Sequence, residues 1–514
     1  MLIGDIIRRS ADRWPDAEAL VDATLAGDGA RYSFAEWNRD VNRLADAFAQ
    51  RGVGEGDRVA LHTYNSIPEV NTYLAVSKLG AVVVPTNHRL AAAELDHVLS
   101  LAEADTLVYD PALADSVRGV ERDLDHVATV EHSRASDPGL ADVTYSGLLE
   151  SGDPAEPPRP SLAPEETNIL MHTSGTTGMP KLVEVAHRGQ WMNSMSNVAE
   201  PGYRHDDRIL DVAPLYHSAG YFNNFLPALQ LGATNVIVAD FDPERTLSLV
   251  ESEGITSFLG VPTHFQRFRT ADVTDYDTGS LRHVVSTGAS LSRPVVDWVR
   301  ENLTERFFNV YGLTESTGFV TLLYPDDRWR NEDGYCIGEP FLNVEVKVVA
   351  ADEDATPDDE VPPDEHGQLI CRSDKITSGY RGQPEKTADA LRDGWLFTGD
   401  VVRRDEDGYF YLVDRMDNRI TTGAENVYPA EVERVLDGFD GISESAVVGV
   451  PDDEWGERVV AYVVRADPDL TADDIERAWR EQSRAAAFKR PREIRFVESI
   501  PTNPSGKILR DELK

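Results

Sequence analysis

A stretch rich in hydroxyl residues and glycine, residues 172–181, reads HTSGTTGMPK. It follows an apolar run, NILMH, that is typical of a buried strand. Backbone N–H groups and hydroxyls in such a loop can surround phosphate oxygens, because Gly175 and Gly178 permit backbone angles that other residues resist. Lys181 adds a positive charge at the far end. The loop predicts a polyphosphate site rather than a flexible turn, although its spacing is not that of a Walker A loop.

The loop closely resembles the phosphate loop of the adenylate-forming superfamily, which includes acyl-CoA synthetases, peptide-synthetase adenylation domains and firefly-type luciferases. Eight further segments resemble that family in the order in which they follow one another: APLYHSAG (213–220), STGASLS (286–292), YGLTES (311–316), IGEP (337–340), LFTGD (396–400), DGYFYLVDR (407–415), TGAENVYPAEVE (422–433) and PTNPSGK (501–507). One small departure is His172, where the family usually has Tyr or Phe. The ordered series resembles the acyl-CoA synthetase branch most.

The resemblance implies a nucleotide site for ATP and Mg²⁺. In this assignment Thr314 contacts the α-phosphate and Glu315 holds the magnesium ion, while Asp400 and Arg415 bind the ribose. The adenine is bordered by Gly288, Ala289, Tyr311 and Gly312. The β- and γ-phosphates are held by Thr173, Ser174, Gly175, Thr176, Thr177, Gly178 and Lys181. A carboxylate is a ligand that Mg²⁺ prefers. Without the resemblance, Glu315 would be interpreted as an acid at a helix start and Asp400 as a turn residue.

The reaction that this family performs needs a positive charge, because a carboxylate attacks the α-phosphate of ATP and the two anions repel each other. The resemblance implies that Lys507 bridges them. A lysine near the end of a chain is ordinarily a solvated surface residue. However, this chain contains only eight lysines and about five times as many arginines, and Lys181, Lys489 and Lys507 all fall in family-like segments.

Three further assignments concern the acyl group and its transfer. His217 in PLYHSAG is expected beside the acyl site, with a buried core histidine as the alternative. Asp417 corresponds to the hinge about which family members rotate the small domain between the two half-reactions. Gly423 and Ala424 are expected to border the channel for coenzyme A, where Ala424 replaces the family's usual second glycine.

These residues predict that the chain activates a carboxylic acid as an acyl-adenylate and passes the acyl group to coenzyme A. A stand-alone adenylation enzyme that loads a carrier protein is the alternative, but amino-acid-selecting members place an Asp in the pocket segment and PLYHSAG has none. A luciferase-like oxygenase and a non-catalytic nucleotide-binding relative are disfavoured. Pocket walls are expected around 217–224 and 312–318, where small residues suit a fatty or aromatic acid and the lack of basic residues disfavours a dicarboxylate.

The elements that must position these residues alternate between strand and helix patterns. RVALHTY (58–64), AVVVP (81–85), TLVYD (106–110), NVIVAD (235–240) and HVVSTGA (283–289) are strand signals, with a helical stretch at 68–79. Such alternation predicts an α/β fold with mostly parallel sheets and helices on both faces. By resemblance, residues 1–414 form a large domain of αβαβα layers with a small β-barrel, and 415–514 form a mobile α+β domain.

Composition limits the partners and the compartment. The chain has 90 acidic and 50 basic residues and a net charge of −40, which is typical of a salt-adapted protein, with an ordinary acidic enzyme as the alternative. Either way, the sequence has no basic footprint for nucleic acid. Its first twenty residues predict an amphipathic helix rather than a signal sequence, and the two cysteines do not suggest a disulfide scaffold or a metal site. The acidic run 351–365 is expected to be a solvated loop and not a metal site. We expect a cytoplasmic enzyme without a transmembrane segment, and we leave a homodimer open.

Overall fold

The computed structural model describes residues 1–24, 29–130, 139–173, 179–289, 291, 293–327, 330, 336–422, 425–452, 455–482, 486–502 and 508–514. The chain divides into two compact units. One consists of Met1–Val346 with Cys371–Leu396, and the other of Lys347–Ile370 with Phe397–Lys514. The predicted division after residue 414 stays a prediction.

A sheet of mainly parallel strands forms one half of the first unit. Across the sheet its strands are β19 (Gly379–Tyr380), β9 (Lys181–Ala186), β8 (Thr167–Thr173), β4 (Val82–Pro85), β3 (Arg58–His62), β5 (Thr106–Tyr109), β6 (His126–Thr129) and β7 (Val143–Thr144). The strands from β8 to β7 are parallel, whereas β9 and β19 run antiparallel to their neighbours. The predicted parallel arrangement is therefore confirmed here.

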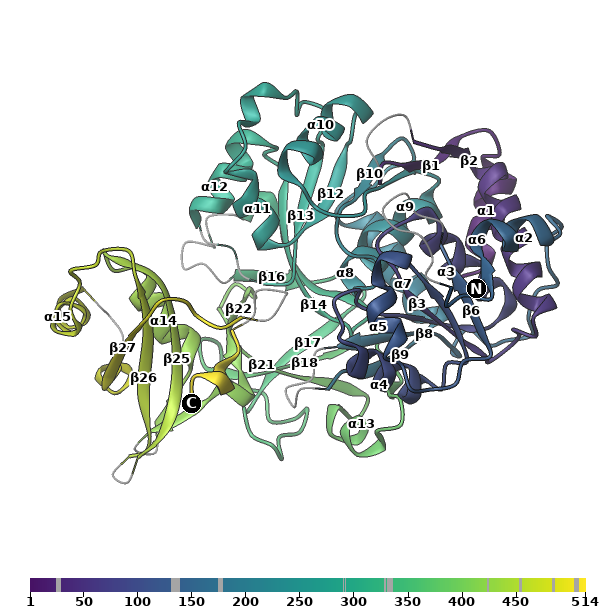
Figure 1. The fold of residues 1–514 in the computed structure, drawn as a ribbon. Helices are drawn as coiled ribbons and strands as arrows, with labels where there is room; N and C mark the ends of the chain where they lie inside the picture. Colours follow the sequence, from purple (N-terminus) through teal and green to yellow (C-terminus); the bar gives the residue numbers. More distant parts are fainter. Residues whose placement is uncertain are drawn as a thin grey trace. The chain divides into compact units, whose positions relative to one another are not determined.

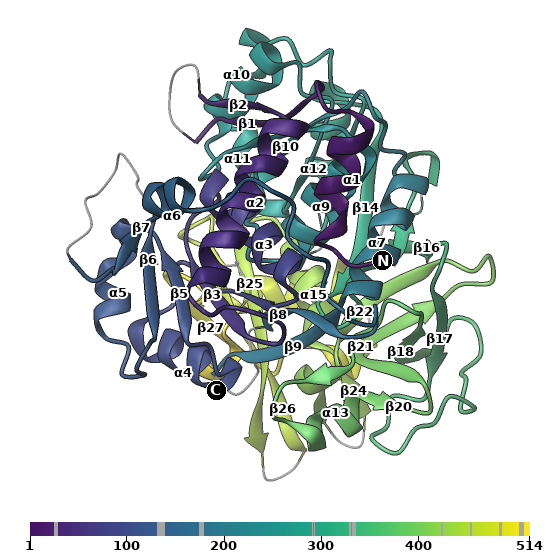
Figure 2. The same ribbon diagram turned by 90° about the vertical axis from the view of Figure 1, so that its right-hand side faces the viewer.

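Helices cover both faces of this sheet (Figure 2). Helices α2 (Phe34–Gln50) and α3 (Ile67–Leu79) pack on one face, and α4 (Ala92–Ala102) and α5 (Ala114–Arg118) pack on the other. Because successive strand residues point to opposite faces, Val83 joins the first cluster while Val82 and Val84 join the second. Helix α3 begins where the Ser66 hydroxyl accepts from the Glu69 N–H and ends at Gly80, whose φ of 73° suits a glycine.

A second, larger sheet carries the other half of the first unit. The strands that belong to this unit are, across the sheet, β2 (Arg31–Ser33), β1 (Glu18–Asp22), β11 (Thr234–Ile237), β10 (Arg208–Asp211), β12 (Ser257–Gly260), β13 (His283–Ser286), β14 (Phe307–Leu313), β15 (Gly318–Leu323) and β16 (Cys336–Pro340). The run from β1 to β14 is parallel. Helices α10 (Pro243–Glu253), α11 (Pro262–Phe268) and α12 (Arg293–Asn302) lie along one of its faces (Figure 1).

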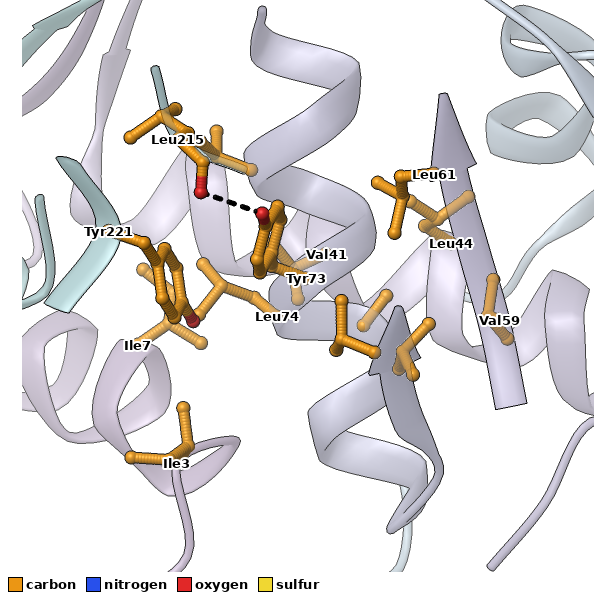
Figure 3. Packing of buried hydrophobic residues seen from close by; sticks show 14 of the residues in the cluster. Ile3, Ile7, Val41, Leu44, Val59, Leu61, Tyr73, Leu74, Leu215 and Tyr221 are labelled. Atoms are coloured by element: carbon orange, nitrogen blue, oxygen red, sulfur yellow. Dashed lines mark hydrogen bonds between the residues drawn. The ribbon is translucent and has the colours of Figure 1, made fainter. Parts of the chain in front are cut away.

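The core between the two sheets is built around aromatic residues of α3 and of the segment that follows β10 (Figure 3). The rings of Tyr73 and Tyr221 stack with centroids 4.4 Å apart. The Tyr73 hydroxyl donates a hydrogen bond of 2.9 Å to the carbonyl oxygen of Leu215. The predicted amphipathic helix at the start of the chain is confirmed as α1 (Asp5–Arg13), whose Ile6 and Ile7 are buried in this core.

The remaining elements of the first unit connect these layers. They are η1 (Pro111–Leu113), α6 (Tyr145–Ser151), α7 (His187–Ala199), α8 (Ser218–Gly220), η2 (Tyr221–Phe225), α9 (Leu226–Leu231), η3 (Val273–Asp275), α13 (Pro384–Ala390) and β20 (Leu391–Arg392). The short element η2 is a turn of π-helix, and it contacts β10, β12 and β15.

The second unit contains two sets of strands. The first set is β17 (Glu345–Val349), β18 (His366–Arg372), β21 (Trp395–Arg404) and β22 (Phe410–Arg415), of which β17, β18 and β21 extend into the unit from the first one. The acidic run 351–365 connects β17 to β18 and is mostly exposed, as expected for a solvated loop. The short turn η5 (Met416–Asn418) follows β22.

The second set forms the small α+β pattern that the sequence predicts. Its strands are, across the sheet, β24 (Glu425–Val427), β23 (Ile420–Thr422), β26 (Gly456–Arg465) and β25 (Ile442–Asp452), with β27 (Glu493–Val497) beside β26. Helices α14 (Pro429–Asp437) and α15 (Ala472–Gln482) and the turns η6 (Ala487–Lys489) and η7 (Arg510–Glu512) complete it. Pro429 occupies the first turn of α14, where its fixed φ favours a helix start.

Candidate active site

The two ends of the phosphate loop meet at the carboxyl end of β8. Thr173 is the last residue of that strand and Lys181 is the first of β9, and the two are register partners in the antiparallel pair. Residues 174–178, which include the predicted Ser174, Gly175, Thr176, Thr177 and Gly178, lie outside the described residues. The loop therefore starts and ends at the edge of a parallel sheet where ligands ordinarily bind in α/β proteins.

Glu315 lies in the tight turn between β14 and β15. The turn needs unusual backbone angles, with a φ of 52° at Thr317 and 111° at Gly318. The Thr377 N–H donates to the carbonyl oxygen of Glu315 at 2.8 Å, which fixes the backbone of the acid. Its side chain is half-buried. The structure therefore holds this carboxylate in a turn, and the alternative of an acid at a helix start is wrong.

A tyrosine that the sequence did not indicate connects Glu315 to the phosphate loop. The Tyr380 hydroxyl donates to Glu315 Oε1 at 2.8 Å. The Lys181 ammonium lies 5.3 Å from the centre of the Tyr380 ring, within the range of a cation–π interaction. Tyr380 reaches this place because β19 pairs with β9, with Tyr380 opposite Val183. Two predicted site residues, Lys181 and Glu315, thus both contact Tyr380.

Thr314 lies beside the segment predicted to line the acyl site. Its side chain is buried, and its Oγ1 lies 3.4 Å from Oγ of Ser218, a contact longer than an ordinary hydroxyl hydrogen bond. Ser218 begins α8, and Ser218, Ala219 and Gly220 are all buried. Gly220 has no space for a side chain, since a Cβ there would lie 2.4 Å from the carbonyl oxygen of Pro214. Packing therefore requires the glycine at position 220.

His217 caps the start of α8. Its Nδ1 accepts from the Ala219 N–H at 3.2 Å, which leaves the proton of the neutral ring on Nε2. The ring is exposed, so the alternative of a buried core histidine is wrong. The protein around the ring lowers the pKa of His217 from its ordinary value by desolvation. His217 therefore offers a neutral N–H donor at the start of α8.

The segment after α8 continues as the π-helical turn η2. Such turns are rare and occur frequently at functional sites. All five of its residues, Tyr221–Phe225, are buried. The predicted pocket wall at 217–224 therefore consists of one exposed imidazole followed by a buried, irregular helix.

The residues predicted to contact adenine lie near the carboxyl ends of two neighbouring strands. Ser286 of β13 is the register partner of Asn309 of β14, and Gly288 and Tyr311 each come two residues later. Gly288 has a φ of 91°, and both it and Ala289 are exposed. These side chains therefore lie at one end of two paired parallel strands.

Gly312, the next residue of β14, is required by close packing. A Cβ there would lie 2.1 Å from the carbonyl oxygen of Gly318. Gly312 and Gly318 are thus in close contact at the two ends of the turn that carries Thr314 and Glu315. This contact fixes the backbone positions of these two residues.

In the second unit the two predicted ribose residues form an ion pair. Asp400 of β21 and Arg415 of β22 are register partners, and Arg415 Nη1 donates to Asp400 Oδ1 at 2.9 Å. The Asp400 side chain is nearly buried, at 7% exposure. The predicted hinge residue Asp417 follows within η5. The predicted Gly423, Ala424 and Lys507 lie outside the described residues.

The comparisons with known proteins decide the family. Residues 7–381 match the family AMP-binding enzyme, and residues 431–507 match the AMP-binding enzyme C-terminal domain. The chain belongs to the AMP-binding enzyme family. This confirms the family predicted from the phosphate loop and the eight further segments.

Relatives of this AMP-binding enzyme align along nearly its whole length. A feruloyl-CoA synthase from Amycolatopsis sp is 37% identical over 513 residues, which cover 98% of both chains. The long-chain-fatty-acid–CoA ligase FadD13 of Mycobacterium tuberculosis is 32% identical over 516 residues, covering 100% of this chain and 98% of the ligase. ATP-bound MatB from Rhodopseudomonas palustris has a TM-score of 0.86 at 27% identity, covering 100% of this chain and 98% of MatB.

These matches place the AMP-binding enzyme in the acyl-CoA synthetase branch, as an ATP-dependent acid–thiol ligase. The predicted fold class is confirmed by the solved structures. Among the described residues, no helix has the length and apolar character needed to cross a bilayer. The homodimer and the cytoplasmic location stay predictions.

One residue of this AMP-binding enzyme contributes to the site region without having been indicated by its motifs. Tyr380 stands in SGYRGQ, a segment whose composition does not mark a ligand site. The signal that could have found Tyr380 is its place on a short strand next to β9, which only the sheet pairing reveals.

Proposed function

We propose that this AMP-binding enzyme activates a fatty or aromatic carboxylic acid as its acyl-adenylate, releases pyrophosphate, and transfers the acyl group to coenzyme A. The proposal is carried by the contacts of Tyr380 with Lys181 and Glu315. These contacts place an ammonium and a carboxylate next to the strands that flank the phosphate loop. An ammonium binds phosphate oxygens directly, whereas a carboxylate requires a cation between itself and the phosphates. The two charges thus suit ATP with its magnesium ion.

The residues of the first unit have separate tasks in the proposed first step. Lys181 and the hydroxyls of residues 173–177 hold the terminal phosphates, and Thr314 contacts the α-phosphate. Gly288, Ala289, Tyr311 and Gly312 border the adenine. Because a carboxylate and the α-phosphate repel each other, the step depends on donors that are positioned before the reactants meet.

Glu315 fits a role in holding Mg²⁺. One of its carboxylate oxygens accepts from Tyr380, which orients the group, and its side chain remains half-exposed. Among the described residues, no three His, Cys, Asp or Glu side chains are grouped as a metal site. Magnesium is ordinarily bound by one or two carboxylates together with substrate phosphates, so a single glutamate suits it. When bound, the ion neutralises charge on the phosphates.

Asp400 and Arg415 support a ribose site. A carboxylate can accept from both ribose hydroxyls, and the Arg415 guanidinium that pairs with Asp400 fixes the orientation of that carboxylate. Lys507 is proposed to bridge the attacking carboxylate and the α-phosphate, on the strength of its PTNPSGK segment. Rotation about Asp417 would then admit coenzyme A beside Gly423 and Ala424.

The chemistry of the acyl segment favours an acid with an uncharged body. Residues 213–225 contain no lysine or arginine, and the pKa of His217 is lowered, so a second carboxylate would find no fixed positive charge. The segment offers small residues followed by aromatic ones. Relatives include a feruloyl-CoA synthase, a long-chain-fatty-acid–CoA ligase and a 4-chlorobenzoate–CoA ligase, which agrees with a fatty or aromatic acid.

A two-stage assay tests the proposal. Pyrophosphate release from MgATP is measured first with acids from acetate to palmitate and with benzoates and cinnamates, and consumption of free coenzyme A thiol is measured second. We expect both signals with at least one fatty or aromatic acid and neither without acid. Pyrophosphate release without thiol consumption would favour a carrier-protein acceptor, and no acid-dependent release at all would contradict the proposed function.

We also propose that the chain is adapted to concentrated salt. Its net charge of −40 and its eight lysines support this proposal. Carboxylates spread over a surface repel one another, and concentrated salt shortens the range of that repulsion.

A further inference from the structure

A fully buried lysine lies next to the segment proposed as the acyl site. Lys375 is only 1% exposed. Its Nζ donates to Oδ1 of Asn193 at 3.1 Å and to the carbonyl oxygen of Phe319. Asn193 belongs to α7 and Phe319 belongs to β15. One ammonium therefore joins two elements that lie far apart in the sequence.

Asn193 extends this contact to the π-helical turn η2. Its Nδ2 donates to the carbonyl oxygen of Phe222 at 3.0 Å and to Oδ1 of Asn223 at 2.9 Å. Asn223 in turn donates from Nδ2 to the carbonyl oxygen of Ser218 at 3.2 Å. All these side chains are buried. A continuous series of hydrogen bonds thus leads from Lys375 to the first residue of α8, next to His217.

The same network packs against the turn that carries Thr314 and Glu315. A Cβ at Gly318 would lie 2.5 Å from Oδ1 of Asn193 and 2.5 Å from Oδ1 of Asn223. Gly318 also has a φ of 111°, which other residues rarely adopt. The amides of the network and the backbone of the turn therefore fit together without spare space.

The charge of Lys375 is not explained by an ion pair, and its Nζ lies 5.0 Å from the centre of the Phe341 ring. Among the described residues, no carboxylate lies within ion-pair distance of its Nζ. Burial lowers its pKa to about 7, and the neighbouring Cys371 and Glu200 oppose that shift only in part. Placing an ammonium in such a site costs free energy, and an apolar side chain of similar size is often no less stable. In a chain with only eight lysines, a lysine at this place indicates a role in ordering its neighbours.

We propose that Lys375 is a positioning residue for the acid substrate. Through Asn193 and Asn223 it fixes the segment from Ser218 to Phe225, against which the acyl group binds. The inference rests on the proposed function, because it assumes that this segment lines the acyl site. It predicts that loss of the ammonium weakens use of the acid much more than use of ATP.

The test compares KM for the acid with KM for ATP in acid-dependent pyrophosphate release, with the acid that the wild-type enzyme uses best. Lys375→Met removes the donor while keeping most of the volume. We expect it to raise KM for the acid about tenfold and to leave KM for ATP within about twofold, as a lost charged hydrogen bond would. Lys375→Gln, whose amide can still donate, should restore part of the effect. Lys386→Met, at an exposed lysine of α13, is the matched control and should change neither constant.

A merely structural role would give a different pattern. A parallel change in both KM values, or a loss of kcat alone, would overturn the proposal. If Lys375→Met is not recovered folded, Asn223→Ala is tested in its place. This variant removes the hydrogen bond to Ser218 and keeps the hydrogen bond between Lys375 and Asn193. An unchanged KM for the acid in this variant would overturn the inference. A wild-type enzyme without acid-dependent pyrophosphate release would instead contradict the proposed function.

Discussion

The hydroxyl of Tyr380 donates a hydrogen bond of 2.8 Å to Oε1 of Glu315, a residue that lies 65 positions earlier in the chain. The bond orients the carboxylate proposed to hold Mg²⁺. The ammonium of Lys181 lies over the ring of the same tyrosine. One tyrosine therefore contacts both the ammonium proposed to hold the phosphates and the carboxylate proposed to hold Mg²⁺.

Tyr380→Phe should weaken the use of MgATP without unfolding the protein. The change removes one hydrogen bond to a carboxylate and keeps the ring under Lys181, so we expect kcat/KM for ATP to fall about tenfold, or about 1.4 kcal/mol. The magnesium concentration for half-maximal activity should rise as well. Pyrophosphate release measured against Mg²⁺ checks both effects, with Tyr276→Phe as the control. An unchanged magnesium dependence would show that Tyr380 does not act through Glu315.

Asp400→Asn should remove discrimination between ATP and 2′-deoxy-ATP. The carboxylate is proposed to accept from both ribose hydroxyls, and an amide of the same shape accepts through one oxygen only. We expect KM for ATP to rise about tenfold and to approach that for the deoxynucleotide. Steady-state kinetics with the two nucleotides checks this. Retained preference for ATP in the variant would place the ribose elsewhere.

Lys507→Ala should separate the two half-reactions. Its ammonium is proposed to act only where the acid carboxylate meets the α-phosphate, so the variant should form no adenylate but should still form the thioester from a supplied acyl-adenylate and coenzyme A. Pyrophosphate release measures the first step and thiol consumption the second. Lys514→Ala, at the last residue of the chain, is the control. Equal loss of both steps would contradict the proposed rotation between them.

Salt should stabilise the enzyme strongly. With a net charge of −40, repulsion between carboxylates extends over about 10 Å at 0.1 M salt and about 3 Å at 1 M. We expect the Tm to rise by more than about 10 °C between those concentrations of KCl, because a change of about 1 kcal/mol in the free energy of unfolding already shifts the Tm of a domain by a few degrees. Activity should rise over the same range of salt. Thermal unfolding in KCl, with glycerol as the uncharged control, measures this. Full stability in dilute buffer would contradict the salt adaptation.

His62→Gln should make the fold less sensitive to acid. Its ring lies between the hydroxyls of Thr86 and Ser116, at 2.8 and 2.9 Å, and burial lowers its pKa to about 3, with His88 and His172 acting in the same direction. Below the ordinary pKa of 6.5 the unfolded state binds a proton that the folded state does not, so stability falls with falling pH. The wild type should lose about 2 kcal/mol more than the variant at pH 5.

Denaturant unfolding at pH 7.5 and pH 5, at constant salt, measures this difference. His205→Gln, at an exposed histidine, should retain the acid sensitivity of the wild type. Equal acid sensitivity in all three proteins would mean that His62 is protonated in the folded state.

The sequence by itself determined the family and the fold class, and it predicted the segments that carry the site. These features are local: a strand followed by a loop of hydroxyls and glycines, or a proline at the first turn of α14, is set by adjacent residues. Their order along the chain was enough to predict an adenylate-forming ligase, which the comparisons confirm.

Only the tertiary structure decided which side chains meet. Tyr380 and Lys375 stand in a segment without any marked composition, and each matters through a partner 65 and 182 residues away, respectively. A lysine is ordinarily exposed, so nothing in the residues next to Lys375 in the sequence predicts its full burial beside Asn193. Such contacts depend on how strands pair and helices pack, and this long-range pairing and packing cannot be predicted from any short stretch of residues.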